Sequence, residues 1–119
     1  LIMVLDADST IDNKCLKNSA RHFLDESIAA TASNVRVVGN GTIIGLAQKY
    51  EYLISHHMKR THTFLGMEYI IGGVGSTFRR EILDKVNYYD SDTMTEDIDL
   101  TLKIITMGGG GKQPRSFCF

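Results

Sequence analysis

Two aspartates separated by one residue, Asp6 and Asp8, directly follow the apolar run Leu1–Leu5. In an extended chain, residues two apart point the same way and lie roughly 6.5–7 Å from each other. Carboxylate oxygens are hard ligands that suit Mg²⁺ or Mn²⁺, with water and phosphate completing the coordination. Aspartates at strand ends are equally common as turn formers and helix caps. The pair alone therefore leaves a metal site and a solvent-facing turn both open.

A second acidic segment, Thr95–Asp99, stands at the expected start of the last helix. The helix dipole favours acidic residues in a first turn by about 0.3–1 kcal/mol each, which explains part of this acidity without any function. A carboxylate such as Asp97, held at a helix start, could instead take the proton from an incoming hydroxyl group.

A glycine-rich segment, Gly72–Ser76, is the third candidate. Glycines permit close approach of the backbone to a ligand, so Gly75 and Ser76 could contact a sugar. A tight turn between two elements explains the same residues when they are taken alone. We interpret the following Arg79 and Arg80 as surface residues rather than phosphate ligands.

A calcium-binding loop is a possible interpretation of the first motif, because oxygen-bearing side chains alternate from Asp6 to Asp12. It fails at two positions that an EF-hand requires. The sixth residue is Ile11 rather than glycine, and the twelfth is Lys17 rather than glutamate.

The elements that must position these residues follow from hydrophobic periodicity. The unbroken apolar run Leu1–Leu5 predicts a central strand of a parallel sheet. Apolar residues at helical spacing predict an amphipathic helix over residues 43–64, with its apolar stripe buried. The remaining expected elements are a helix over 14–25, strands at Val35–Val38 and Tyr69–Ile71, a strand end and short helix over Thr77–Val86, and a last helix capped by Thr93 or Thr95. This alternation predicts an α/β fold with a mainly parallel sheet flanked by helices.

Composition excludes several classes of protein. The 119 residues carry a net charge of −1 and no long basic run, which argues against nucleic acid as a partner. No apolar run approaches the ~20 residues of a membrane span. The two cysteines, Cys15 and Cys118, have neither disulfide-framework nor zinc spacing, so we expect a reducing compartment.

Taken together, the three motifs resemble a processive family 2 glycosyltransferase. The resemblance rests on Asp6-Ala7-Asp8, on Gly-x-Gly-Ser-x-Phe-Arg-Arg-x-x-Leu over residues 73–83, and on Thr-Glu-Asp-x-Asp over residues 95–99. It is closest to the poly-N-acetylglucosamine, cellulose and hyaluronan synthase type. It implies that residues 1–107 are the C-terminal part of a GT-A catalytic domain, with 108–119 as an irregular tail.

The resemblance implies inverting, metal-dependent transfer of a sugar, N-acetylglucosamine in the first place, from a UDP-sugar donor to a growing glycan acceptor. Asp6 and Asp8 would hold the Mg²⁺ or Mn²⁺ ion, and Asp6 would also contact the donor. Asp97 would be the catalytic base. Glu96, Gly75 and Ser76 would bind substrate. The parent enzyme would be membrane-embedded, with this domain at the cytoplasmic face of the plasma membrane.

An alternative family fits the first motif. Asp6–Thr10 matches the Asp-x-Asp-x-Thr of haloacid dehalogenase-like Mg-dependent phosphatases, where Asp6 would be the nucleophile and Asp8 the general acid. That alternative leaves the glycine-serine segment unexplained. The transferase family in turn carries a Gln-x-x-Arg-Trp motif that this sequence lacks, and we assign Gln113 and Arg115 no role.

The sequence opens directly on an apolar strand without an initiating methionine, and we expect an upstream portion of the domain to be missing. An unpaired apolar strand edge favours self-association. The isolated chain is then expected to have no activity of its own.

Overall fold

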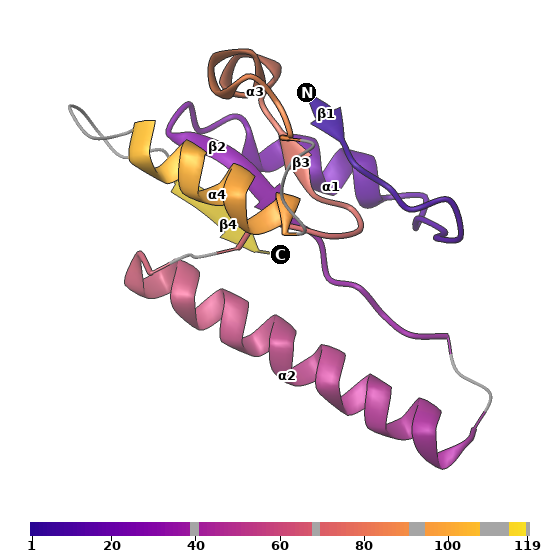
Figure 1. Cartoon of the computed structure of the whole chain (residues 1–119). Helices are drawn as coiled ribbons and strands as arrows, with labels where there is room; N and C mark the ends of the chain where they lie inside the picture. The colour runs from indigo at the N-terminus through magenta and orange to yellow at the C-terminus, as the bar shows by residue number, and fades with distance from the viewer. Residues whose placement is uncertain (39–40, 68–69, 91–94, 108–114, 119) are drawn as a thin grey trace.

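A computed structural model describes residues 1–38, 41–67, 70–90, 95–107 and 115–118; for the last range it describes the backbone alone. The described chain is a mixed α/β structure with one sheet (Figure 1). Its elements are β1 (Ile2–Met3), α1 (Cys15–His22), β2 (Ile28–Ala32), α2 (Ile43–Leu65), β3 (Thr77–Phe78), α3 (Arg80–Val86), α4 (Glu96–Met107) and β4 (Arg115–Cys118).

The sheet has the strand order β1-β3-β2-β4. β3 pairs antiparallel with both β1 and β2, and β4 pairs parallel with β2. Mainly parallel pairing is therefore not confirmed. β1, β2 and β4 run in one direction, but β3 is inserted between β1 and β2 in the opposite direction and separates them.

β1 lies at the edge of this sheet, so the predicted central position of Leu1–Leu5 is wrong for the described strands. Only Ile2 and Met3 pair with β3, and Leu1 and Leu5 are exposed. An apolar run without alternation indicates burial on both faces, but it does not specify which strands will be present to pair with it.

The second strand is β2, which is entirely buried, and not the predicted Val35–Val38. The small side chains of β2 let the sheet pack closely against neighbouring helices. In contrast, Arg36 and Val38 are exposed, and their segment forms no strand. The β-branched valines favour a strand by propensity, but burial of β2 in the core outweighs that local preference.

A compact core fixes the main body. Phe78, Leu83 and Leu100 are buried almost completely, and Ile104 and Val86 pack with them. A buried hydroxyl network adds to it, because Ser19 on α1 donates to Thr77 (2.9 Å) and lies 3.2 Å from Thr31.

Arg79 ties the start of α3 to the start of β2 and to the segment between α1 and β2. Its Nε donates to the carbonyl of Ile28 (2.7 Å), and its Nη2 donates to the carbonyls of Phe23 and Asp25 (2.8 Å each). The guanidinium also lies over the Phe23 ring, 5.3 Å from its centroid. The interpretation of Arg79 as a surface residue is therefore wrong, because its guanidinium is partly buried and engaged by backbone carbonyls, whereas Arg80 is exposed as expected.

The long helix α2 is confirmed almost to the residue. Thr42 accepts a hydrogen bond from the Gly45 N–H (3.1 Å) at its start, and Gly66, with φ +66°, ends it. The predicted burial of its apolar stripe is wrong, because Gly45 is its one buried residue. In Figure 1, most of α2 extends away from the other helices, and within the sheet it contacts β4. Among the described helices, none is long and apolar enough to cross a membrane.

The remaining predictions hold in part. α1 ends at His22 rather than at residue 25, and Thr77–Val86 contains a strand and a short helix as expected. The last helix begins at Glu96, while Thr93 and Tyr69 lie outside the described residues, and Ile70 and Ile71 form no strand. In the tail, where the sequence showed no periodicity, Arg115–Cys118 forms β4.

Candidate active site

The end of β1 lies directly against the glycine-rich turn. The Val4 N–H donates to the carbonyl of Ser76, and the Gly75 N–H donates to the carbonyl of Val4, both at 2.8 Å. These bonds continue the β1–β3 pairing past Met3, so the strand end that leads into the acidic pair lies against a turn about 70 residues further along the sequence. Asp6 follows Val4 by two residues, so the acidic pair leaves the sheet at this point.

The same turn holds the start of α4. The carboxylate Oδ2 of Asp97 accepts a hydrogen bond from the Gly73 N–H at 3.0 Å. Gly72 has no side chain, and a Cβ there would overlap the Cβ and Cγ atoms of Asp97. Glycine at position 72 is therefore what allows Asp97 to lie against the turn. Figure 1 shows the loop after β1, the turn and the start of α4 at the same end of the body.

Thr101 anchors α4 to the residue before the turn. Its buried hydroxyl donates to the carbonyl of Asp97 (2.7 Å) and accepts from the N–H of Ile71 (2.8 Å). One side chain therefore fixes both the helix that carries Asp97 and the backbone that leads into Gly72. Nothing in the sequence singles out Thr101, because a threonine within a helix commonly bonds only the carbonyl four residues before it.

We expect Thr101→Val to lower the free energy of unfolding by about 1–3 kcal/mol, because the buried Ile71 N–H loses its acceptor. Urea unfolding followed by circular dichroism measures this change. Thr106→Val is the matched control: Thr106 makes the same kind of bond to Leu102 (2.8 Å) but is exposed. Its expected change lies within about 0.5 kcal/mol. Equal losses in both variants would show that the Ile71 contact contributes nothing.

The two aspartates of α4 have different surroundings. Asp99 forms an ion pair with Lys103 at 3.2 Å, and Lys103 also contacts Asp90. The hydrogen bond to Asp90 is the main cause of the raised pKa of Lys103, against the opposing effect of burial. Asp97 instead faces the glycine turn. Asp99 is thus engaged in an ion pair, whereas Asp97 belongs to the contact between motifs.

Tyr89 is a second residue near this contact that the sequence did not single out. It is half-buried and packs against the core. Burial in the first place, followed by the negative charges of Asp97 and Glu96, raises the pKa of the Tyr89 phenol above its ordinary value. The phenol therefore stays protonated near neutral pH, close to both carboxylates. A single tyrosine in a loop has no sequence pattern around it from which its place beside Asp97 and Glu96 could be predicted.

Asp6 and Asp8 are both exposed in the turn after β1, where the Ser9 N–H donates to the carbonyl of Asp6 (3.1 Å). Among the described side chains, no three His, Cys, Asp or Glu residues are grouped to hold a metal ion. Two exposed carboxylates still fit the needs of Mg²⁺, which commonly takes one or two protein carboxylates and fills its other positions with water and phosphate.

The predicted substrate-binding residues differ in accessibility. Glu96 is exposed, whereas Gly75 and Ser76 are buried. The Ser76 hydroxyl has no hydrogen-bond partner among the described atoms. A Cβ on Gly75, whose φ is +79°, would lie 2.7 Å from the Cβ of Ser33. Gly75 is therefore explained by backbone geometry and close packing.

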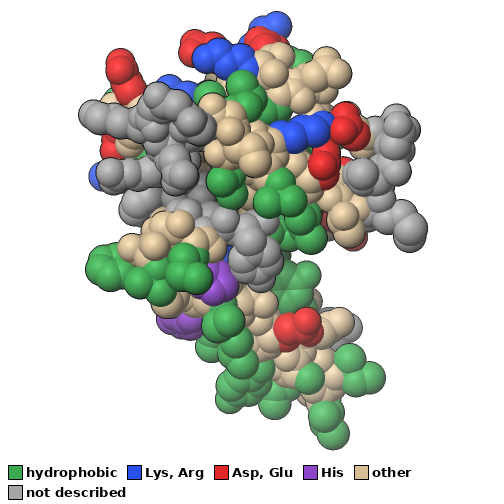
Figure 2. All heavy atoms as spheres, turned by 60° about the vertical axis from the view of Figure 1, so that its left-hand side comes forward, with side chains coloured by type: hydrophobic (Ala, Val, Ile, Leu, Met, Phe, Trp, Pro, Cys, Tyr) green, Lys and Arg blue, Asp and Glu red, His purple; other side chains and the backbone are tan. Residues whose placement is uncertain are grey.

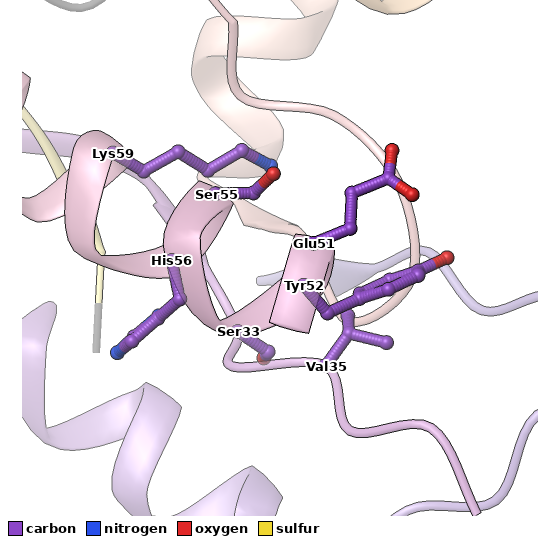
Figure 3. Close-up of a pocket in the computed structure, with 7 residues that line it drawn as sticks. All are labelled: Ser33, Val35, Glu51, Tyr52, Ser55, His56 and Lys59. Carbon is purple, nitrogen blue, oxygen red and sulfur yellow. The ribbon is translucent and has the colours of Figure 1, made fainter. Parts of the chain in front are cut away.

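A hollow of about 230 Å³ adjoins the glycine turn (Figure 3). Ser33 connects the two, because its hydroxyl lines the hollow and donates to the carbonyl of Gly75 (2.7 Å). The other lining residues come from α2 and from the segment after β2: Val35, Glu51, Tyr52, Ser55, His56 and Lys59. Burial, and then the charge of Arg60, lowers the pKa of His56. The hollow thus has one aromatic ring and several polar groups beside the site.

The glycine turn contacts both the end of β1, which leads into Asp6, and Asp97 at the start of α4. Comparison with known proteins supports the family that the three motifs resemble. The chain belongs to the family described as glycosyl transferase family group 2, whose model matches residues 1–111. The family resemblance inferred from the motifs is therefore confirmed, and the phosphatase alternative gains no support.

Within this family, the chain is similar to synthases of one polysaccharide. The chain is 31% identical, over 121 aligned residues, to the poly-beta-1,6-N-acetyl-D-glucosamine synthase of Staphylococcus aureus strain COL. The same identity is found with the synthase of this name from Staphylococcus epidermidis. Each alignment covers 99% of this chain but 29% of the relative, so the chain spans less than a third of the length of these proteins.

Proposed function

We propose that this chain carries the catalytic base and the metal-binding carboxylates of an inverting glycosyltransferase that uses a UDP-sugar donor. The observation that carries the proposal is the contact chain from β1 through the glycine turn to Asp97. It joins the residues that the resemblance assigns to the donor with the residue that it assigns to the acceptor hydroxyl.

Asp97 is the proposed general base. Proton removal makes the acceptor oxygen a better nucleophile, and a positioned carboxylate can accept that proton. The Gly73 N–H bound to the Oδ2 oxygen orients the group, and Asp97 is partly exposed, so an acceptor hydroxyl can reach it from solvent. Glu96 and the protonated Tyr89 phenol flank the same region and are proposed to orient the acceptor.

Asp6 and Asp8 are the proposed ligands of Mg²⁺ or Mn²⁺. A divalent cation at this position would neutralise the departing diphosphate. The exposed location of both carboxylates supports this assignment, since a donor must reach them from solvent.

We expect the 119-residue chain to bind Mn²⁺ weakly, because two carboxylates leave most coordination positions to water. Asp8→Ala should weaken this binding by roughly tenfold or more, since even changes around a metal ligand commonly cost 10–100-fold. Calorimetric titration with Mn²⁺ measures both affinities. Asp12→Asn is the control, because Asp12 is exposed nearby and its Oδ1 caps the Lys14 N–H. Equal affinity for Asp8→Ala and unaltered protein would exclude Asp8 as a ligand.

The donor is proposed to be UDP-N-acetylglucosamine and the acceptor a growing glycan; the family resemblance implies a UDP-sugar and a glycan, and the relatives' names contain N-acetyl-D-glucosamine. The test measures UDP release by the full-length enzyme with UDP-N-acetylglucosamine, UDP-glucose and UDP-glucuronate in turn. Faster release from the first donor supports the proposal. Phosphate release from p-nitrophenyl phosphate, with no UDP release from any donor, would instead favour the phosphatase alternative. The proposed location is the cytoplasmic face of the plasma membrane.

A further inference from the structure

The long helix α2 turns its apolar side away from the rest of the molecule. Its large apolar side chains recur every three or four residues on one side of the helix and are exposed from 52% (Leu53) to 90% (Phe64). We call this set the α2 stripe: Ile43, Leu46, Tyr50, Leu53, Ile54, Met58, Phe64 and Leu65. Figure 2 shows hydrophobic side chains gathered along this part of the surface.

The opposite side of α2 is the one that faces the body. Gly45 is buried, and His56, Lys59 and Thr63 are partly buried. Polar groups therefore contact the protein while apolar groups contact solvent, the reverse of an ordinary surface helix. Contiguous apolar surface of this kind marks an interaction site.

Charge indicates the chemistry of the partner. Lys49 and Arg60 are exposed and border the stripe beside Leu53, and Lys59 adds a third cation to the helix. Glu51 is the one acidic side chain within α2. Apolar residues with a basic border match a helix that lies in the plane of an anionic lipid surface.

A second copy of the chain fits the stripe less well. Symmetric partners meet through the same patch on both copies. Two antiparallel α2 helices crossing at Ile54 would place Lys49 of each copy near Arg60 of the other, and like charges would repel. An anionic bilayer neutralises the same cations.

We propose that the α2 stripe docks onto an anionic lipid bilayer, with the helix lying flat along about 35 Å of its surface. This docking is independent of the transferase chemistry proposed above. It would hold the glycine turn and Asp97 at a fixed height above the membrane, because the hollow beside the turn is walled by the other side of α2.

The test measures co-sedimentation of the 119-residue chain with phosphatidylglycerol-containing vesicles and with pure phosphatidylcholine vesicles. We expect stronger binding to the anionic vesicles, weakening as salt is raised. Leu53→Glu should lower binding roughly tenfold or more, and Lys49→Ala and Arg60→Ala about fivefold each. Leu24→Glu is the control, because Leu24 is 85% exposed and lies outside the stripe. Its binding should be unchanged.

A second measurement does not depend on the stability of the Leu53→Glu protein. The sequence contains no tryptophan, so Tyr50→Trp places a single reporter in the stripe and Tyr88→Trp places one on an exposed part of the body. Lipids with brominated acyl chains should quench only the Tyr50→Trp fluorescence. Equal quenching of both, absence of vesicle binding, or a dimer in light scattering that Leu53→Glu disperses would overturn the proposal.

Discussion

Asp97→Asn is expected to lower the turnover of the full-length enzyme by about 10²–10⁴-fold, the usual contribution of general acid–base catalysis. The amide keeps the size of the side chain, and its oxygen can still accept the Gly73 hydrogen bond, but it cannot take a proton from the acceptor. Donor affinity should change little, because the donor contacts are assigned to Asp6 and Asp8. Steady-state rates of UDP release and donor titration together measure both quantities.

Asp99→Asn is the matched control for this experiment. Both aspartates lie in the first turn of α4, but Asp99 is paired with Lys103, which also pairs with Asp90. We expect Asp99→Asn to affect stability more than the chemical step. Near-normal turnover with Asp97→Asn, together with a large loss with Asp99→Asn, would show that the base is assigned to the wrong carboxylate.

Gly72→Ala is expected to have the second largest effect, because the added methyl group would occupy the space of the Asp97 side chain. Overpacking at such a contact costs about 1–3 kcal/mol of unfolding free energy. Displacement of Asp97 should also reduce turnover by about tenfold to a hundredfold, since misplacement by about 1 Å can cost that much. Urea unfolding of the 119-residue chain and rates of the full-length enzyme are the two measurements.

A double-mutant cycle identifies the cause of the stability loss. If overlap with Asp97 is responsible, Gly72→Ala should destabilise the Asp97→Ala protein far less than the unaltered protein, with a coupling of about 1 kcal/mol or more. Additive effects would instead indicate that position 72 requires glycine for another reason. The cycle uses stability alone, so it is independent of the proposed activity.

The long helix and the three motifs could be recognised in the sequence because each depends only on residues that are close together in the chain. α2 shows an apolar period over 23 residues, with Thr42 and Gly66 as capping residues, and it formed as expected. The order and spacing of the motifs were enough to indicate the family. The position of the second strand depended on burial instead. The buried residues of β2 form the strand, whereas the valine-rich segment 35–38, which was predicted to form it, does not.

Contacts between distant residues could not be predicted. Asp99 has a partner four residues further along its own helix, Lys103, whereas nothing local predicts that Asp97 accepts a hydrogen bond from the distant Gly73 N–H. Thr101 likewise gains its importance only from the Ile71 N–H that lies against it.

The sequence by itself determined the family and where the long helix begins and ends, because motif spacing, helical period and capping depend on neighbours in the chain. The tertiary structure alone decided that β3 lies between β1 and β2, that Gly72 makes room for Asp97, and that the apolar side of α2 faces outward. Periodicity specifies that a helix has an apolar side; which surface that side meets depends on the packing of segments far apart in the chain.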